Sequence, residues 1–346
     1  MSYNENKHFH RPDGRRRGLS LRSRADAGKS RSEAVLFGEL LDSWLAVTRL
    51  SVKESSFVQY RKLVDNYVRP YLAKLPICEL DRAVLDKHVI FLSAEGRKDR
   101  RGGLSPKSVY DVMSVVRDCL RYAAALGLPL SFDPGPVTVR KNAPDMRVLS
   151  PEEQKKLMRV LSSGTDNCKL GVMLSLYTGL RIGELCALKW ENFDLDNKLL
   201  SVRKTLQRIQ SDADSGPKTR IVITSPKSEH SVRTIPLPPF LAELSAEFYT
   251  APEDFVLSGS PERFVEPRTM QYRFKKYVAE AGIADANFHA LRHTFATRCI
   301  ECGFETKSLS EILGHSSVSL TLNRYAHASM ELKRQNMNKL NSVCVV

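Results

Sequence analysis

The sequence predicts two domains, an all-α domain followed by an α+β domain with a small antiparallel sheet. The 346 residues suffice for two domains of roughly 150 residues each. Apolar residues recur at helical spacing between residues 35 and 130, and a proline-rich break near residue 140 ends this stretch. Beyond the break, helical patterns alternate with β-branched runs of strand length, which is typical of an α+β domain.

The first 33 residues are rich in basic side chains and carry hardly any large apolar ones, so they cannot form a core. The basic residues include Arg15, Arg16, Arg17, Arg22, Arg24, Lys29 and Arg31. We expect residues 1–33 to be a disordered basic arm. A solvated tail without a role is the alternative.

The all-α domain is expected at residues 34–132. Its apolar residues are spaced three and four positions apart, as on one face of a helix. They are Leu36, Leu40, Leu41, Trp44, Leu45, Tyr60, Leu63, Val64, Tyr67, Val109, Val112, Met113 and Val116. This pattern indicates several amphipathic helices that share one small core.

A helix is expected to begin at Ser105 and Pro106, because serine caps free backbone N–H groups and proline suits the first helical position. Lys107, Arg117 and Arg121 follow on this helix. They are candidate DNA contacts, since basic side chains bind phosphates. A solvated helix surface explains each of them equally well.

A linker is expected at residues 133–147, where three prolines interrupt regular structure. The segment from Ser150 to Glu153 then opens a helix with a capping box. The α+β domain is assigned to residues 148–328, with helices up to about residue 189 and again from residue 269. Its strands are predicted at 199–202, 221–224 and 232–235. Residues 329–346 remain as an apolar tail.

The composition favours a polyanionic partner. The chain has 53 Lys plus Arg against 39 Asp plus Glu, a net charge of +14, so counterion release would drive binding to nucleic acid. An anionic membrane surface is the alternative. The longest uncharged apolar stretch, residues 170–180, is too short to cross a bilayer, which takes roughly 20 residues. With no secretory signal at its start, the chain is expected to be cytoplasmic.

Seven cysteines, an odd number, are scattered through apolar segments, as expected of reduced thiols. Cys299 and Cys302 form the one close pair. A zinc site needs a second pair or histidines at ligand spacing, so no metal is expected.

Two arginines have the chemistry to stabilise a phosphoryl-transfer transition state. Planar, permanently charged guanidinium groups suit the negative charge that builds on non-bridging oxygens. Gly179 can end a helix and so direct Arg181 into a cleft; the alternative is a surface ion pair of Arg181 with Glu184. Arg292 is the second candidate.

His289 precedes Arg292 by three positions, so both lie on one helix face and can reach the same phosphate. His289 is a candidate general base or hydrogen-bond partner. His289 and His293 also resemble a zinc-protease motif, but Ala290 stands where that motif has its glutamate base. We therefore expect His293 to be a structural, hydrogen-bonding histidine.

Three further residues complete the candidate site. Lys227 lies in a turn between two predicted strands, with Lys204 and Lys218 as alternatives. His315 follows a glycine that can end the helix before it. Tyr325 lies near the end of the next short helix; a phenol with a pKa near 10 needs a cationic surrounding to act as nucleophile. Ordinary packing is the alternative for Tyr325.

Segments 177–185, 225–228, 289–294, 313–315 and 324–327 together resemble, in order and character, the active-site segments of the tyrosine recombinases. This family includes phage integrases, Xer proteins and conjugative-transposon integrases. The resemblance covers most of the chain from about residue 35. It fills six catalytic positions: Arg181, Lys227, His289, Arg292, His315 and Tyr325.

The resemblance implies an all-α SAM-like core-binding domain followed by a tyrosine-recombinase catalytic domain. Tyr325 would attack a DNA phosphate to give a 3′-phosphotyrosyl link, Lys227 would protonate the departing 5′ oxygen, and His315 would hydrogen-bond the phosphate. No cofactor, ATP or metal is implied. A type IB topoisomerase and a catalytically silent DNA-binding relative are the alternatives.

The expected partners are double-stranded DNA attachment sites, bound by a homotetramer on two duplexes that passes through a Holliday junction. The tail, residues 329–346, would be exchanged between protomers; a helix folded back on its own domain is the alternative. Accessory DNA-bending or directionality factors are further candidate partners. We expect the protein to be associated with the nucleoid and to be encoded by a mobile genetic element. No membrane partner is expected.

Overall fold

The computed structural model describes residues 35–99, 101–130, 146–164, 166–211, 217–225, 231–325, 334 and 337–338, with residues 323 and 324 described by their backbone alone. The chain divides into two compact units, Met1–Ala143 and Pro144–Val346. The expected basic arm, nearly all of the linker and most of the tail lie outside the described residues.

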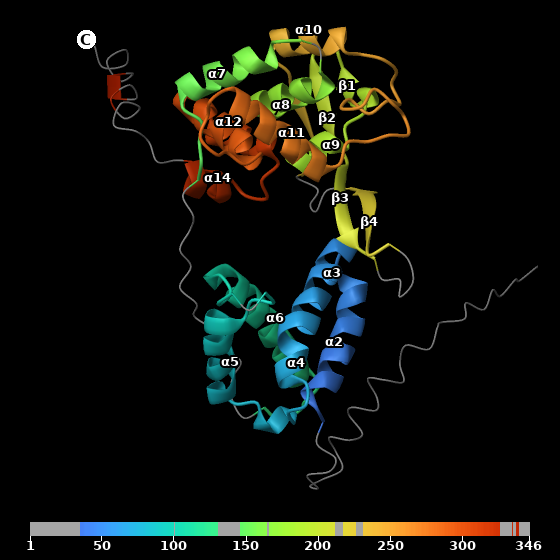
Figure 1. Cartoon of the computed structure of the whole chain (residues 1–346), viewed down its shortest axis with the longest axis vertical. Helices are drawn as coiled ribbons and strands as arrows, with labels where there is room; N and C mark the ends of the chain where they lie inside the picture. The colour runs from blue at the N-terminus through green and yellow to red at the C-terminus, as the bar shows by residue number, and fades with distance from the viewer. Residues whose placement is uncertain are drawn as a thin grey trace, which may run out of the picture. The chain divides into compact units, whose positions relative to one another are not determined.

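The described part of the first unit is helical throughout (Figure 1). Its elements are α2 (Phe37–Ser51), α3 (Glu54–Leu63), a π-helical turn (Val64–Val68), α4 (Arg69–Leu72), a 3-10 turn (Ile77–Glu79), α5 (Arg82–Glu95) and α6 (Pro106–Ala125). One apolar core joins these helices. The predicted all-α domain is therefore observed.

The predicted start of α6 is confirmed: the Ser105 hydroxyl accepts a hydrogen bond from the Ser108 N–H at 3.2 Å, and Pro106 is the first helical residue. The expected apolar positions are mostly buried, with one exception in α2. Leu36 is the N-cap and is 39% exposed, while Phe37 is fully buried in its place. The helical spacing predicted the buried positions within α2 correctly, but Leu36 precedes the helix and is turned away from the core.

The second unit mixes helices and strands. Its helices are α7 (Pro151–Leu161), α8 (Asn167–Thr178), α9 (Ile182–Cys186), α10 (Pro239–Glu247), α11 (Pro267–Glu280), α12 (His289–Glu301), α13 (Thr306–Leu313) and α14 (Val318–Tyr325), with a 3-10 turn (Trp190–Asn192). The capping box that opens α7 is confirmed, since Ser150 and Glu153 each accept a hydrogen bond from the other's backbone N–H.

Two small antiparallel sheets lie between α9 and α10. The first sheet has the order β1 (Phe193–Asp194), β2 (Leu199–Val202), β5 (Arg233–Pro236), and Leu200 pairs with Ile235. The second is a hairpin of β3 (Thr205–Gln210) and β4 (Thr219–Thr224) that projects from the helices of this unit (Figure 1).

The sequence did not predict β1, β3 or α10. In β3 only Leu206 and Ile209 are buried, and the polar residues among them hide the strand pattern. Helix α10 begins at Pro239 behind a run of prolines that reads as a loop, although proline is tolerated in the first helical turn.

Helix α8 forms the centre of the second unit. It is buried on nearly all sides and packs against α7, α10, α11 and α12 (Figure 1). The apolar stretch at 170–180 is thus a core helix, which explains why it lacks an amphipathic pattern. Within the described residues, no helix is both long and apolar enough to cross a membrane.

Candidate active site

The predicted helix end at Gly179 is confirmed. Gly179 follows the last residue of α8 with φ 68°, the left-handed conformation that glycine adopts without strain. The chain then turns, and Arg181 becomes the N-cap of α9. The Arg181 side chain is 36% exposed, so part of it is accessible to a ligand.

Arg181 does pair with Glu184, at 2.7 Å between Nη1 and Oε1, but this is not a surface ion pair. Glu184 is only 3% exposed and also accepts the Arg181 backbone N–H at 2.9 Å. Burial alone would raise the pKa of Glu184, yet the hydrogen bonds and charges of Arg233 and Arg181 hold it below its usual value. Glu184 is therefore a carboxylate built into the site.

Arg292 lies on α12, three residues after His289 as predicted, and is 2% exposed. Its Nη1 and Nη2 donate to the Gly179 and Leu313 carbonyls, each at 2.7 Å. Burial and the neighbouring charge of Arg181 lower the pKa of Arg292 to about 9. The group is thus cationic at neutral pH and fixed in direction before any ligand binds.

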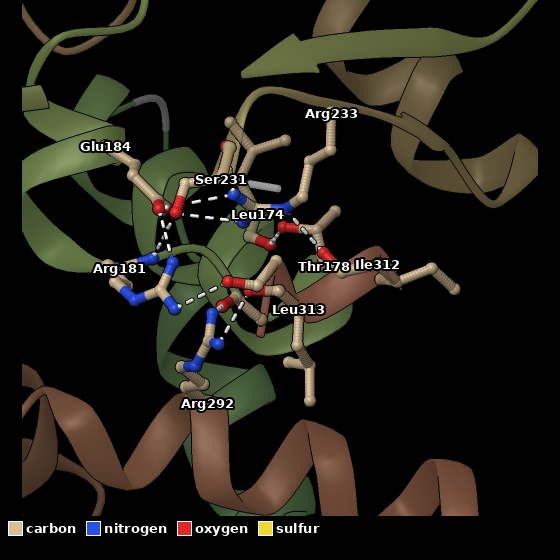
Figure 2. A network of polar contacts seen from close by, with 11 residues as sticks. Leu174, Thr178, Arg181, Glu184, Ser231, Arg233, Arg292, Ile312 and Leu313 are labelled. Carbon is tan, nitrogen blue, oxygen red and sulfur yellow. Dashed lines mark hydrogen bonds and ion pairs between the residues drawn. The ribbon is translucent and has the colours of Figure 1, made fainter. Parts of the chain in front are cut away.

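Three arginines meet at the C-terminal end of α13, which Gly314 closes in the left-handed conformation with φ 62° (Figure 2). Each of three successive carbonyls there accepts a hydrogen bond from a different arginine: Ile312 from Arg233 at 2.5 Å, Leu313 from Arg292 at 2.7 Å, and Gly314 from Arg181 at 3.1 Å. Helix ends leave such carbonyls without helical partners. The guanidinium groups satisfy them, and this fixes the turn that leads into His315.

Arg233, on β5, was not predicted as a site residue. Its side chain is 5% exposed and forks onto Glu184, with Nη2 to Oε2 at 2.9 Å and Nη1 to Oε1 at 3.2 Å. One signal was present in the sequence. Arg233 stands two positions before Ile235, so both face the core side of the same strand, where a charge must have a partner.

Tyr325 ends α14 and is packed against α12 and α13, with 6% of the residue exposed. Its hydroxyl lies 2.9 Å from Nδ1 of His293. The ring is parallel to the His315 ring, with centroids 6.4 Å apart and an interplanar angle of 3°. The expectation that His293 forms a hydrogen bond is confirmed, and its partner is the candidate nucleophile.

The structure thus gathers five of the six predicted positions. His315 is hydrogen-bonded through Nδ1 to the Thr321 hydroxyl at 2.7 Å, and the His289 ring contacts the His293 ring with centroids 4.5 Å apart. Two guanidinium groups lie at the end of α13, and a phenol in contact with the rings of His293 and His315 packs against α12 and α13. This set suits nucleophilic attack on a phosphodiester.

Lys227 lies in segment 226–230, outside the described residues. The alternatives are described: Lys204 is 57% exposed and 3.9 Å from Glu191, and Lys218 is exposed next to β4. Among the described residues, neither lysine forms a hydrogen bond or ion pair with the arginine network, so Lys227 stays the prediction.

The three candidate DNA contacts of the first unit lie on α6. Lys107 and Arg121 are 78% and 63% exposed, and each is near an aspartate of the same helix. Arg117 is different, because only 17% of its side chain is exposed. Lys107 and Arg121 are thus accessible to a phosphate, whereas Arg117 is largely covered.

Among the residues that the structure describes, no group of three His, Cys, Asp or Glu side chains could hold a metal ion. Burial raises the pKa of the Cys299 thiol to about 12, and Cys302 is exposed. The thiolate form that binds metals is therefore disfavoured at Cys299.

Two family models match the sequence. The model described as "Phage integrase family" matches residues 147–331, and "Phage integrase, N-terminal SAM-like domain" matches residues 36–92. A tyrosine recombinase XerC-like protein of Caldanaerobacter subterraneus subsp. tengcongensis is 27% identical over 90% of this chain and 84% of its own length. Tyrosine recombinase XerA of Thermococcus onnurineus is 30% identical over 70% of this chain and 78% of its own length.

Solved structures share the fold. The Tn1549 transposon integrase, in complex with a circular intermediate DNA, has a TM-score of 0.70 at 21% identity and covers 89% of this chain and 100% of its own. A lambda integrase tetramer bound to a Holliday junction has a TM-score of 0.62 at 18% identity and covers 91% of this chain and 84% of its own.

Proposed function

The chain belongs to the phage integrase family of tyrosine recombinases, and from this we infer that it cleaves and rejoins DNA at specific sites through a 3′-phosphotyrosine intermediate. The observation that carries this inference is the convergence of Arg181, Arg292 and Tyr325 at the end of α13. Two guanidinium groups can stabilise the charge on the phosphate, and the phenol beside them can act as the nucleophile.

In the proposed cleavage step, Oη of Tyr325 forms a bond to phosphorus and the bond from phosphorus to the 5′ oxygen breaks. The phenol proton passes to an imidazole, for which His289 is the predicted base. Lys227 gives a proton to the departing 5′ oxygen. Arg181 and Arg292 stabilise the charge on the non-bridging oxygens, and His315 hydrogen-bonds the phosphate.

Rejoining reverses these steps with the 5′ hydroxyl of a partner duplex. The energy of the phosphodiester is kept in the phosphotyrosyl link, so ATP is not required. The arginines supply the positive charge that metal ions supply in many other phosphoryl-transfer enzymes, and we propose that cleavage is metal-independent.

We propose that four protomers act on two DNA attachment sites and exchange strands in two rounds through a Holliday junction. The lambda integrase relative, a tetramer bound to such a junction, supports this assembly. Residues 329–346, an apolar tail, are the proposed segment exchanged between protomers. The exposed Lys107 and Arg121 are proposed to contact the DNA backbone.

The test is the formation of a covalent protein–DNA adduct on a duplex with a nick next to the scissile phosphate, which releases a short fragment and so traps the intermediate. The DNA should come from the region flanking the gene, where an integrase commonly has its attachment site. We expect the adduct in the presence of a metal chelator and without ATP. DNA binding without any adduct would instead indicate a catalytically silent relative.

A further inference from the structure

Arg233 differs from the other two arginines of the network in how its donors are used. Its Nε donates to the Ile312 carbonyl, Nη1 to Glu184 and to the Ser231 carbonyl at 3.1 Å, and Nη2 to Glu184. Four of the five N–H groups of a guanidinium thus have protein partners, in a side chain that is 5% exposed. Arg233 is therefore placed as an internal counterion and not as a phosphate ligand.

Glu184 is the point where Arg233 and Arg181 compete. Each carboxylate oxygen of Glu184 accepts from Arg233, while Arg181 reaches one of them with Nη1 and turns Nη2 to the Gly314 carbonyl (Figure 2). Charges a few ångströms apart interact strongly in a buried setting, so the partner that neutralises Glu184 decides how much of Arg181 remains for a ligand.

The charge balance of the cluster leads to the same conclusion. Arg181, Arg233 and Arg292 against Glu184 leave two net positive charges for an incoming phosphate. Without Arg233, one net positive charge would remain, and Arg181 would be the sole partner of a buried carboxylate. Arg181 would then be drawn toward Glu184, away from the exposed side of the site.

We propose that Arg233 is a positioning residue for strand cleavage: it neutralises Glu184 and ties that carboxylate to the end of α13, which leaves Arg181 available for the scissile phosphate. This inference rests on the proposed function. Arg233 also donates to the Ser231 carbonyl, which helps to hold its guanidinium group in place.

The experiment compares Arg233→Met with the wild-type chain on two nicked substrates. One has an ordinary scissile phosphodiester, and the other has a methylphosphonate there, in which a methyl group replaces a charged oxygen. Removal of a charge-stabilising interaction costs about 100-fold in rate. We expect Arg233→Met to lose about that factor on the phosphodiester and less than about 10-fold on the methylphosphonate, since the neutral substrate needs less positive charge.

The ratio of the two rates measured on one protein sample does not depend on the fraction that is folded. The charge-balanced double variant Glu184→Gln/Arg233→Met should regain at least about 10-fold on the phosphodiester, because no carboxylate remains to compete for Arg181. Arg147→Met is the matched control. Arg147 pairs with Glu153 and donates to the Val148 carbonyl, and it shares no residue with the network. This variant should leave the substrate ratio unchanged.

An equal loss on both substrates, or a double variant no faster than Arg233→Met, would show that Arg233 only stabilises the fold and would overturn the inference. If Arg233→Met does not fold, Arg233→Lys is measured on the same two substrates. Lysine keeps the charge but lacks the fork, and a substrate ratio like that of the wild type together with normal cleavage would support the electrostatic role. A wild-type chain that forms no adduct on the phosphodiester overturns the proposed function, and the role of Arg233 falls with it.

Discussion

Nδ1 of His293 lies 2.9 Å from the hydroxyl oxygen of Tyr325, and both residues are more than nine-tenths buried. The two side chains come from α12 and α14, 32 residues apart in the sequence. The imidazole therefore restrains the direction of the phenol hydroxyl. His293 directly follows Arg292 on α12.

This contact predicts an effect of His293 on cleavage. His293→Phe leaves the buried hydroxyl without this partner, a loss of about 1–3 kcal/mol for an unmade buried hydrogen bond. We expect adduct formation to slow by about 10-fold or more, with DNA affinity unchanged. His293→Gln can still hydrogen-bond the hydroxyl and should be faster than His293→Phe. Equal rates for the two variants would mean that the hydrogen bond has no part in cleavage.

The left-handed turn at Gly179 predicts a steric effect on the arginines. A Cβ added there would lie 2.7 Å from Leu313 Cδ2 and from Phe295 Cδ1, in addition to the strain at φ 68°. Gly164→Ala is the control, because Gly164 has φ 81° but nothing within 4 Å of such a Cβ. A left-handed alanine costs about 1–2 kcal/mol, which lowers Tm by about 2–8 °C in a domain of this size.

We expect Gly179→Ala to lower Tm by more than Gly164→Ala does, and to reduce cleavage by at least about 10-fold, because the helix ends that bind Arg292 must shift. Calorimetry and the adduct assay on both variants check this. If Gly164→Ala were equally impaired in cleavage, crowding at the arginine site would not be the cause.

Local signals in the sequence predicted several helix ends. Gly179 and Gly314 end α8 and α13 in the left-handed conformation, and the capping box at Ser150 begins α7, as expected. Each of these signals acts within one turn of the chain. Long-range pairings could not be predicted in this way. Glu184 meets Arg233 across 49 residues, and nothing in either segment alone specifies that partner.

The same limit applies to the fold. The cores of α2 and α6 follow from helical spacing, because burial of one face is a local pattern. Helix α8 is buried on nearly all sides and was recognised by its continuous apolar run. Strand β3 was missed because its pairing with β4 is set by partners outside the strand, as at Leu206 and Ile223. Whether a half-polar segment becomes a strand depends on that partner more than on its own residues.

Lys227 as general acid makes a chemical prediction. Lys227→Ala should cleave an ordinary substrate slowly, by about 100-fold or more, since the 5′ oxygen departs without a proton. A substrate with sulfur at that bridging position has a leaving group that needs no proton, and its rate in the variant should approach that of the wild type. Lys204→Ala and Lys218→Ala are the comparison variants; selective rescue in one of them would assign the acid to that lysine.

The basic arm predicts a change in salt dependence. Deletion of residues 1–33 removes nine Lys and Arg side chains. Each phosphate contact that is lost changes the slope of log affinity against log salt by about 0.9. We expect the slope to become less negative in the truncated chain, measured by titration of attachment-site DNA at several salt concentrations. A slope equal to that of the full chain would leave the arm without a role in DNA binding.

The role of Tyr325 as nucleophile is tested most directly by adduct formation of Tyr325→Phe on the nicked substrate. The variant lacks only the hydroxyl, so it should bind attachment-site DNA with nearly the affinity of the wild type and form no covalent adduct on a denaturing gel. Tyr249→Phe, at an exposed tyrosine of the same unit, should form the adduct normally. A covalent adduct that persists in Tyr325→Phe would show that Tyr325 is not the nucleophile.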